Sequence, residues 1–128
     1  MQPLTSDWIQ KAEGDFVTAG RELRARKLPN HNACCFHAQQ CAEKYLKARL
    51  QEAQIRFPKT HDLLKLLELV LQKEPFWETL RPALTYLNEF AVSFRYPGES
   101  ADKATAKEAF GFCAIVRKEV RHGLFLKS

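Results

Sequence analysis

Arg95, Tyr96 and Pro97 are consecutive residues whose side chains suit a phosphate-containing ligand. An arginine guanidinium can form two hydrogen bonds to one phosphate, and a tyrosine ring can stack on a nucleobase. The alternative is structural: Tyr96 packs in the core, and Arg95 forms an ion pair with an acid such as Glu99. Pro97 and the glycine after it predict a loop, and loops between rigid helices often carry binding residues. The sequence therefore favours the binding interpretation.

His61 and Asp62 stand just after Thr60, at the predicted start of a helix. One interpretation places His61 in a cleft, where its imidazole reaches toward Arg95. The other assigns Asp62 to the helix cap and gives His61 a local hydrogen bond. Lys44, from the polar side of an earlier helix, would add a positive charge for phosphate in that cleft.

Cys34, His37 and Cys41 lie within about 60° of one another on a helical wheel and could form part of a metal site. Zinc normally takes four ligands, and the sequence holds no companion pair of cysteines or histidines. We therefore predict no metal site and no cofactor. All four cysteines, Cys113 included, are expected to be reduced thiols that serve as small apolar residues.

The elements that position these residues begin with the segment from Phe36 to Lys47, which has no glycine, proline or β-branched residue and is predicted to be helical. Small and apolar residues cover more than half of its circumference, which is typical of the central helix of a bundle. At least one of Gln39 and Gln40 should be partly buried, with a hydrogen bond inside the bundle or at a dimer contact. Glu43 and Lys47 have the spacing of a surface ion pair, and the outward-facing Phe36 is expected at a dimer interface.

Five helices are predicted from periodic apolar residues, over residues 7–26, 31–54, 61–73, 77–94 and 101 or 102 to 122. Thr5 or Ser6 is expected to cap the first helix, and Thr60 the third. Pro82 lies near the start of the fourth helix, where proline is tolerated. Short connections favour antiparallel neighbours, so we predict an all-α, up-and-down bundle of about five helices.

The chain has 128 residues, of which 45% are hydrophobic, and a formal net charge of +5. This length suits one domain over residues 1–128, and the apolar content excludes a disordered chain. The apolar runs are too short to span a membrane, and the N-terminus lacks the features of a signal peptide. We therefore predict a cytoplasmic protein that does not associate with membranes. The positive charge is compatible with a nucleotide or RNA partner.

Three motifs, in this order and spacing, resemble the HEPN domain family (higher eukaryotes and prokaryotes nucleotide-binding). They are Phe36-His37-Ala38-Gln39-Gln40-Cys41-Ala42-Glu43-Lys44 with Lys47, then Thr60-His61-Asp62-Leu63-Leu64, then Arg95-Tyr96-Pro97. The resemblance covers residues 8–122. It implies a helical bundle that pairs as a homodimer. Many prokaryotic members are encoded beside a minimal nucleotidyltransferase, often as a toxin–antitoxin pair.

Many members of that family are metal-independent ribonucleases, whose signature is Arg-x(4–6)-His near the start of the last long helix. Counted from Arg95, the histidine would fall at Ser100, Ala101 or Asp102, and none of these is histidine. Histidine can exchange a proton near neutral pH, as such cleavage requires, whereas serine cannot. The sequence therefore favours a protein without enzyme activity.

Arg117 and His122 have the same Arg-x(4)-His spacing, but they lie at the far end of the last helix. We interpret this match as a solvated helix end whose cations complement the helix dipole.

The predicted function is a homodimeric HEPN-type binding or regulatory module for a nucleotide or RNA, or for a minimal nucleotidyltransferase in a toxin–antitoxin-like system. The predicted ligand-binding residues are Arg95, Tyr96, His61 and Lys44. The first alternative is a metal-independent ribonuclease toxin that uses Arg95 with His61 or His122. The second is a bundle that only dimerises or tethers a partner.

Overall fold

The computed structural model describes residues 1–91 and 98–128. Within them the chain forms five α-helices and two short 3-10 segments, and no strand. The elements in chain order are α1 (Pro3–Arg24), α2 (His31–Glu52), α3 (Leu63–Val70), η1 (Pro75–Leu80), α4 (Arg81–Asn88), η2 (Glu89–Ala91) and α5 (Lys103–Gly123). The prediction of an all-α, up-and-down bundle is confirmed. Among the described helices, none is long and apolar enough to cross a membrane.

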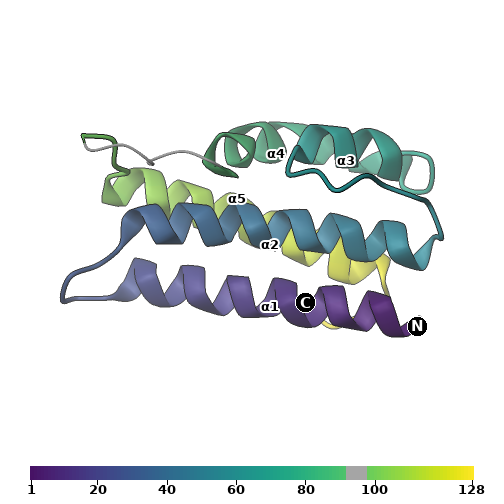
Figure 1. The fold of residues 1–128 in the computed structure, drawn as a ribbon, viewed down its shortest axis with the longest axis horizontal. Coiled ribbons are helices and arrows are strands. Elements are labelled where there is room, and N and C mark those ends of the chain that lie inside the picture. The colour runs from purple at the N-terminus through teal and green to yellow at the C-terminus, as the bar shows by residue number, and fades with distance from the viewer. Residues whose placement is uncertain (92–97) are drawn as a thin grey trace.

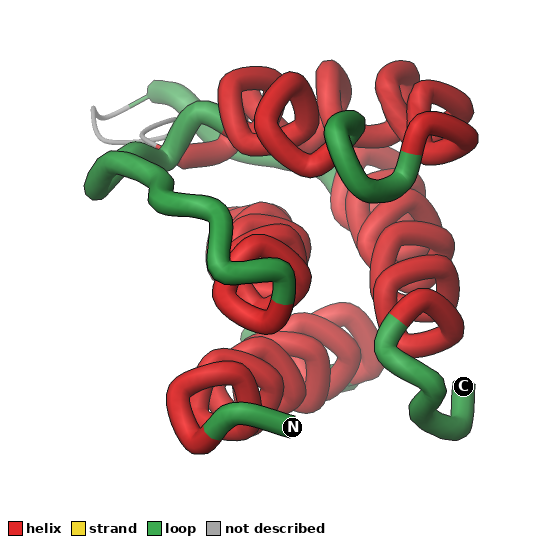
Figure 2. The backbone as a smooth tube through the Cα atoms, turned by 90° about the vertical axis from the view of Figure 1, so that its right-hand side faces the viewer, coloured by secondary structure: helices red, strands yellow, loops and turns green. Residues whose placement is uncertain are grey.

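The α2 helix is the centre of the bundle, as its sequence predicts. Figures 1 and 2 show α1 along one side of it, α3 and α4 along the opposite side, and α5 behind. Twelve of its 22 residues are buried, and Gln39 is among them. All four cysteines of the chain are free and buried. The remaining side of α2 meets solvent and the segment that leads to α3 (Figure 2).

The first helix begins earlier than predicted. Pro3 occupies its first turn and Gln2 precedes it, so neither Thr5 nor Ser6 is the cap. Proline suits this position because the amide hydrogen that it lacks would have no partner inside the helix. The Gln2 backbone N–H instead donates to Oε1 of Glu52, at 3.0 Å, which ties the start of α1 to the end of α2.

The third helix starts after Asp62, not after Thr60. The Asp62 carboxylate accepts hydrogen bonds from the backbone N–H groups of Leu64 and Lys65, at 3.0 and 3.4 Å. The Thr60 hydroxyl accepts from the Asp62 N–H at 3.1 Å, so it stabilises the turn before the helix. Both residues are good caps by type, and the position of the first buried residue, Leu63, decides between them.

The predicted fourth helix is divided into η1, α4 and η2. Pro82 has no amide hydrogen, so an α-helix cannot continue through it with full hydrogen bonding, and α4 begins at Arg81. Residues 92–94 of the predicted helix lie outside the described residues. The last helix begins at Lys103, and Asp102 caps it by accepting from the Thr105 N–H at 2.8 Å. That agrees with the predicted start.

Candidate ligand-binding face on α2

The open side of α2 holds a carboxylate between a lysine and a histidine. Oε1 of Glu43 lies 2.9 Å from Nδ1 of His61, and Oε2 lies 3.0 Å from Nζ of Lys47. The side chains of Glu43 and Lys47 are only 4% and 7% exposed, so the predicted surface ion pair is in fact buried. The ammonium group of Lys47 also lies 5.5 Å from the centre of the Trp8 ring.

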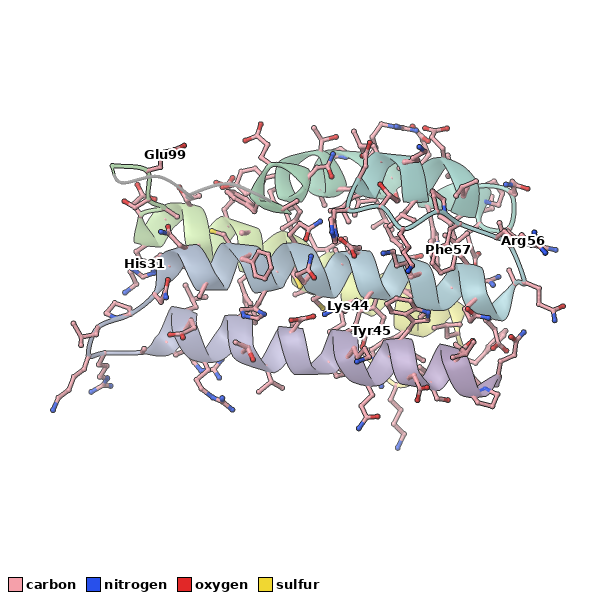
Figure 3. The ribbon with its side chains drawn as sticks, in the orientation of Figure 1. His31, Lys44, Tyr45, Arg56, Phe57 and Glu99 are labelled. Carbon is pink, nitrogen blue, oxygen red and sulfur yellow. The ribbon has the colours of Figure 1, made fainter. Side chains whose placement is uncertain are left out.

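A second carboxylate, on α1, has the same kind of partners. Oδ1 of Asp15 lies 2.7 Å from Nδ1 of His37, and Oδ2 lies 2.6 Å from Nζ of Lys44. Asp15 is buried, whereas both partners on α2 are half-buried. Figure 3 shows Lys44 between α2 and α1. Two lysine–carboxylate–histidine groups therefore lie along α2, one on its α3 side and one on its α1 side.

These contacts determine which ring nitrogen of each histidine carries a hydrogen. A carboxylate only accepts hydrogen bonds, so Nδ1 of His61 and of His37 carries the hydrogen. The opposite nitrogen, Nε2, is then the one that can accept from a ligand, or donate to it after protonation. The His61 side chain is 69% exposed, against 31% for His37, so His61 is the more accessible of the two.

The glutamines hold the His61 segment against α2. The fully buried Gln39 donates from Nε2 to the backbone oxygen of His61 at 3.0 Å. Its Oε1 accepts a hydrogen bond from Gln40 at 2.7 Å. The prediction that at least one glutamine is buried and bonded within the bundle is confirmed.

Asn88, the last residue of α4, fixes the other side of the same segment. Its Oδ1 accepts from the Leu63 N–H at 2.8 Å, and its Nδ2 donates to Asp62 at 3.1 Å. The middle of α2, the start of α3 and the end of α4 thus meet around His61. Sequence reasoning missed Asn88, Asp15 and the buried role of Glu43, because each depends on contacts between helices.

The predicted site residues are only partly brought together. Arg95 and Tyr96 lie outside the described residues. His61 bonds across to Glu43, so the alternative of a purely local hydrogen bond for His61 is wrong. Lys44 follows Glu43 in α2 but turns to Asp15 on the α1 side, whereas His61 meets Glu43 on the α3 side. The two predicted residues therefore have separate partners on different sides of α2.

Arg117 and His122, the second Arg-x(4)-His match, belong to another part of the bundle. Glu13 accepts hydrogen bonds from Arg117 and Arg121, and Tyr45 donates to it at 2.6 Å. Burial opposes the ionisation of Glu13, but the bonds from Arg117 and Tyr45 outweigh it and hold the pKa of this carboxyl below its usual range. The prediction of a solvated helix end is therefore wrong for Arg117, while His122 is exposed.

The two histidines of the ribonuclease alternative face different surfaces. Glu43 and Tyr45 are two residues apart, so their side chains leave α2 about 200° apart. His61 bonds to Glu43, whereas Arg121, the neighbour of His122, bonds to Tyr45. His61 and His122 therefore lie on opposite sides of α2 within one chain.

The helices and their order now allow comparison with known proteins. The family model of the HEPN domain matches residues 5–123. This chain belongs to the HEPN domain family. The family assignment made from the three motifs is confirmed. The HEPN match includes the residues of the two lysine–carboxylate–histidine groups along α2, which together we call the α2 face: His37, Glu43, Lys44 and Lys47 with their partners Asp15 and His61. A comparison with the curated proteins found no match.

Solved structures share the HEPN fold at low sequence identity. The crystal structure of TT1696 from Thermus thermophilus is 22% identical, with a TM-score of 0.81 over 94% of this chain and 98% of that chain. The crystal structure of ST0689, an archaeal HEPN homologue, is 23% identical, with a TM-score of 0.75 over 97% of this chain and 99% of that chain. These likenesses concern the fold.

Proposed function

We propose that this HEPN domain protein is a homodimeric, cytoplasmic binding module whose ligand is a nucleotide or an RNA segment. The observation that carries this proposal is that the His61 ring is both hydrogen-bonded and exposed to solvent. Its ring is held by the buried Glu43, and yet 69% of the side chain is exposed. A side chain that is fixed on one edge and open on the other is available for contact with a ligand.

The position of His61 in the chain supports the same reading. Asn88 anchors the His61 segment to the end of α4. Arg95 and Tyr96 follow Asn88 by seven and eight residues in the sequence. We propose that Arg95 binds phosphate, that Tyr96 stacks on a base, and that His61 and Lys44 contact the same ligand.

Dimerisation is proposed from the apolar surface near this face. Phe36 is 42% exposed on α2, and its ring packs edge-on against that of His37, with centroids 5.3 Å apart. A half-exposed phenylalanine beside a polar site suits a contact with a second copy of the chain. Light scattering after size-exclusion chromatography would test this, and a Phe36→Glu variant should shift a dimer to a monomer.

Binding is tested by titrating the protein with labelled ATP and with a short labelled single-stranded RNA. Arg95→Ala should weaken binding on the order of tenfold, since it removes a charged hydrogen bond, and His61→Ala should weaken it severalfold. Lys118→Ala, at an exposed position near the far end of α5, is the control and should bind normally. Absence of binding by the wild-type protein would refute the proposal.

A second candidate function, metal-independent ribonuclease activity, is favoured by the same hydrogen bond. A histidine oriented by a carboxylate, with its second nitrogen exposed, is what proton transfer to or from RNA requires. The test is incubation with RNA in the presence of EDTA. Cleavage that is lost in both Arg95→Ala and His61→Ala would establish an enzyme. Dependence on His122 in place of His61 would show that the α2 face is not the site.

We also propose a minimal nucleotidyltransferase as the protein partner, in a toxin–antitoxin-like system. The adjacent reading frame and co-purification with its product test this. Complex formation that survives Arg95→Ala and Tyr96→Ala, without ligand binding, would instead favour a tethering bundle.

A further inference from the structure

One end of the bundle has a basic cavity, which we call the α1–α5 cavity. The end of α1, the start of α2 and the start of α5 surround it, and its volume is about 680 Å³. Arg24, Arg26, Lys103 and Lys107 line it, together with His31, which Figure 3 labels at the start of α2. This size lies within the range of about 300–1,000 Å³ that is typical of small-molecule sites.

The positive charges of the α1–α5 cavity have no carboxylate partner among the residues that line it. No carboxylate is among its lining residues, and none of Arg24, Arg26, Lys103 and Lys107 forms an ion pair with another residue in 1–91 or 98–128. Other arginines of the bundle, such as Arg49, do have carboxylate partners. These four cations are exposed and have no carboxylate partner, so their charges are available to an anion that enters the cavity.

His31 adds a second, independent observation. Its Nδ1 is buried and has no hydrogen-bond partner among the described residues. Buried ring nitrogens are normally bonded to protein or to ordered water, so this one marks an unmet hydrogen bond in the wall of the cavity. A neighbouring acid, Asp102, is engaged as the cap of α5 through the Thr105 N–H, at 2.8 Å. That bond, with a smaller contribution from His31, keeps the pKa of Asp102 below its usual range, so its carboxylate stays charged beside the cavity without filling it.

We propose that the α1–α5 cavity binds a chain of closely spaced phosphates. Lys103 and Lys107 are four residues apart and share one face of α5. Arg24, the last residue of α1, and Arg26, in the turn after it, line the same cavity. Four cations match the charge of a triphosphate, or of a few consecutive backbone phosphates, better than that of a single phosphate. The choice of phosphate as the anion rests on the proposed function; the existence of an anion site does not.

Free tripolyphosphate, ATP and a short single-stranded RNA distinguish the sources of that phosphate chain. Isothermal titration at moderate ionic strength would compare wild-type protein with the double variant K103Q/K107Q. The matched control is K73Q/K118Q, which removes the same charge at two exposed lysines away from the cavity. Both lysines of the cavity are also exposed, so folding of the test variant is checked by its unchanged thermal transition.

The expected result is that tripolyphosphate binds the wild-type protein and the control equally. The double variant should bind it on the order of tenfold more weakly, because two charged contacts are lost. Tighter binding of ATP than of tripolyphosphate would identify a nucleotide as the source, and tighter binding of RNA would identify a strand. Equal weakening in the control, or no binding of tripolyphosphate to wild-type protein, would overturn the proposal.

The same titrations separate this inference from the proposed function. RNA or ATP binding that falls in Arg95→Ala but not in K103Q/K107Q would keep the proposed function and refute the α1–α5 cavity. Tripolyphosphate binding that depends on Lys103 and Lys107, with no added affinity for ATP or RNA, would keep the cavity as an anion site and count against the proposed function.

Discussion

The buried pair of Glu43 and Lys47 allows a quantitative prediction. Glu43→Gln removes the negative charge but leaves Lys47, which is 7% exposed, beside the ring of Trp8. Breaking a buried ion pair by removing one partner costs about 3–5 kcal/mol, because an uncompensated charge stays buried. Attraction between an ammonium and a tryptophan ring is worth about 0.5–2 kcal/mol and offsets part of this cost. We expect a loss near the lower end, about 3 kcal/mol.

The double variant Glu43→Gln/Lys47→Met should recover much of that loss. Methionine keeps most of the volume of the lysine stem and carries no charge, so no unpaired ion remains in the bundle. Lys47→Met alone should cost less than Glu43→Gln, because the Glu43 carboxylate keeps its contact with His61 at 2.9 Å. The cycle should therefore show a coupling of about 2 kcal/mol between the two residues.

Urea denaturation followed by circular dichroism would measure these changes. For a chain of 128 residues, a loss of about 3 kcal/mol corresponds to a drop of roughly 10 °C in Tm. The exposed pair of Glu78 and Arg81 supplies the control, and Glu78→Gln should leave the denaturation midpoint unchanged. Additive single effects, or a Glu43→Gln variant as stable as the wild type, would show that the pair is hydrated and that the reasoning is wrong.

Three further variants probe other contacts. Glu13→Gln should be less stable than wild type at pH 7, because the ionised Glu13 carboxylate, whose pKa is lowered in the fold, stabilises the folded protein. The difference should shrink below about pH 4, where this carboxylate becomes protonated. Urea denaturation curves at several pH values test this. Asn88→Ala should cost about 1 kcal/mol by leaving the Leu63 N–H unpaired. Gly123→Ala should cost about 1–3 kcal/mol, because its methyl group would lie 2.7 Å from the buried Trp77 ring; thermal melts measure both.

The helices of this protein could be predicted because each has a continuous apolar face, and α2 could be recognised as central because apolar residues cover most of its circumference. The residue types near a helix start were not enough to predict which residue caps the helix. Thr60 and Asp62 are equally plausible caps by residue type, and packing of the next residue into the core decides between them. The division of the fourth helix follows from Pro82, which is tolerated in the first turn of α4 but prevents the helix from extending back to Trp77.

The polar groups of the α2 face could not be predicted from spacing within one helix. Glu43 and Lys47 look like a surface pair from the sequence, and they are buried because Trp8 and the His61 segment cover them. Asp15 lies on another helix, so its contacts with His37 and Lys44 depend on how α1 and α2 are aligned. Charges that pair across helices leave no periodic signal, whereas the motifs that identify the family can be read from the order and spacing of their residues.

The two proposed sites are separated along α2 in a way that bears on the ligand. His31 begins this helix, and Glu43, which holds His61, is twelve residues further on. The two positions are about 18 Å apart along the helix axis and about 120° apart around it. Stacked nucleotides in one strand are about 3.4 Å apart, so the axial separation alone corresponds to roughly five of them. A single nucleotide in the α1–α5 cavity would then leave His61 without a ligand, whereas an RNA strand could contact both. Joint dependence of RNA binding on Lys103 and His61, with ATP binding sensitive to only one of them, follows from this geometry.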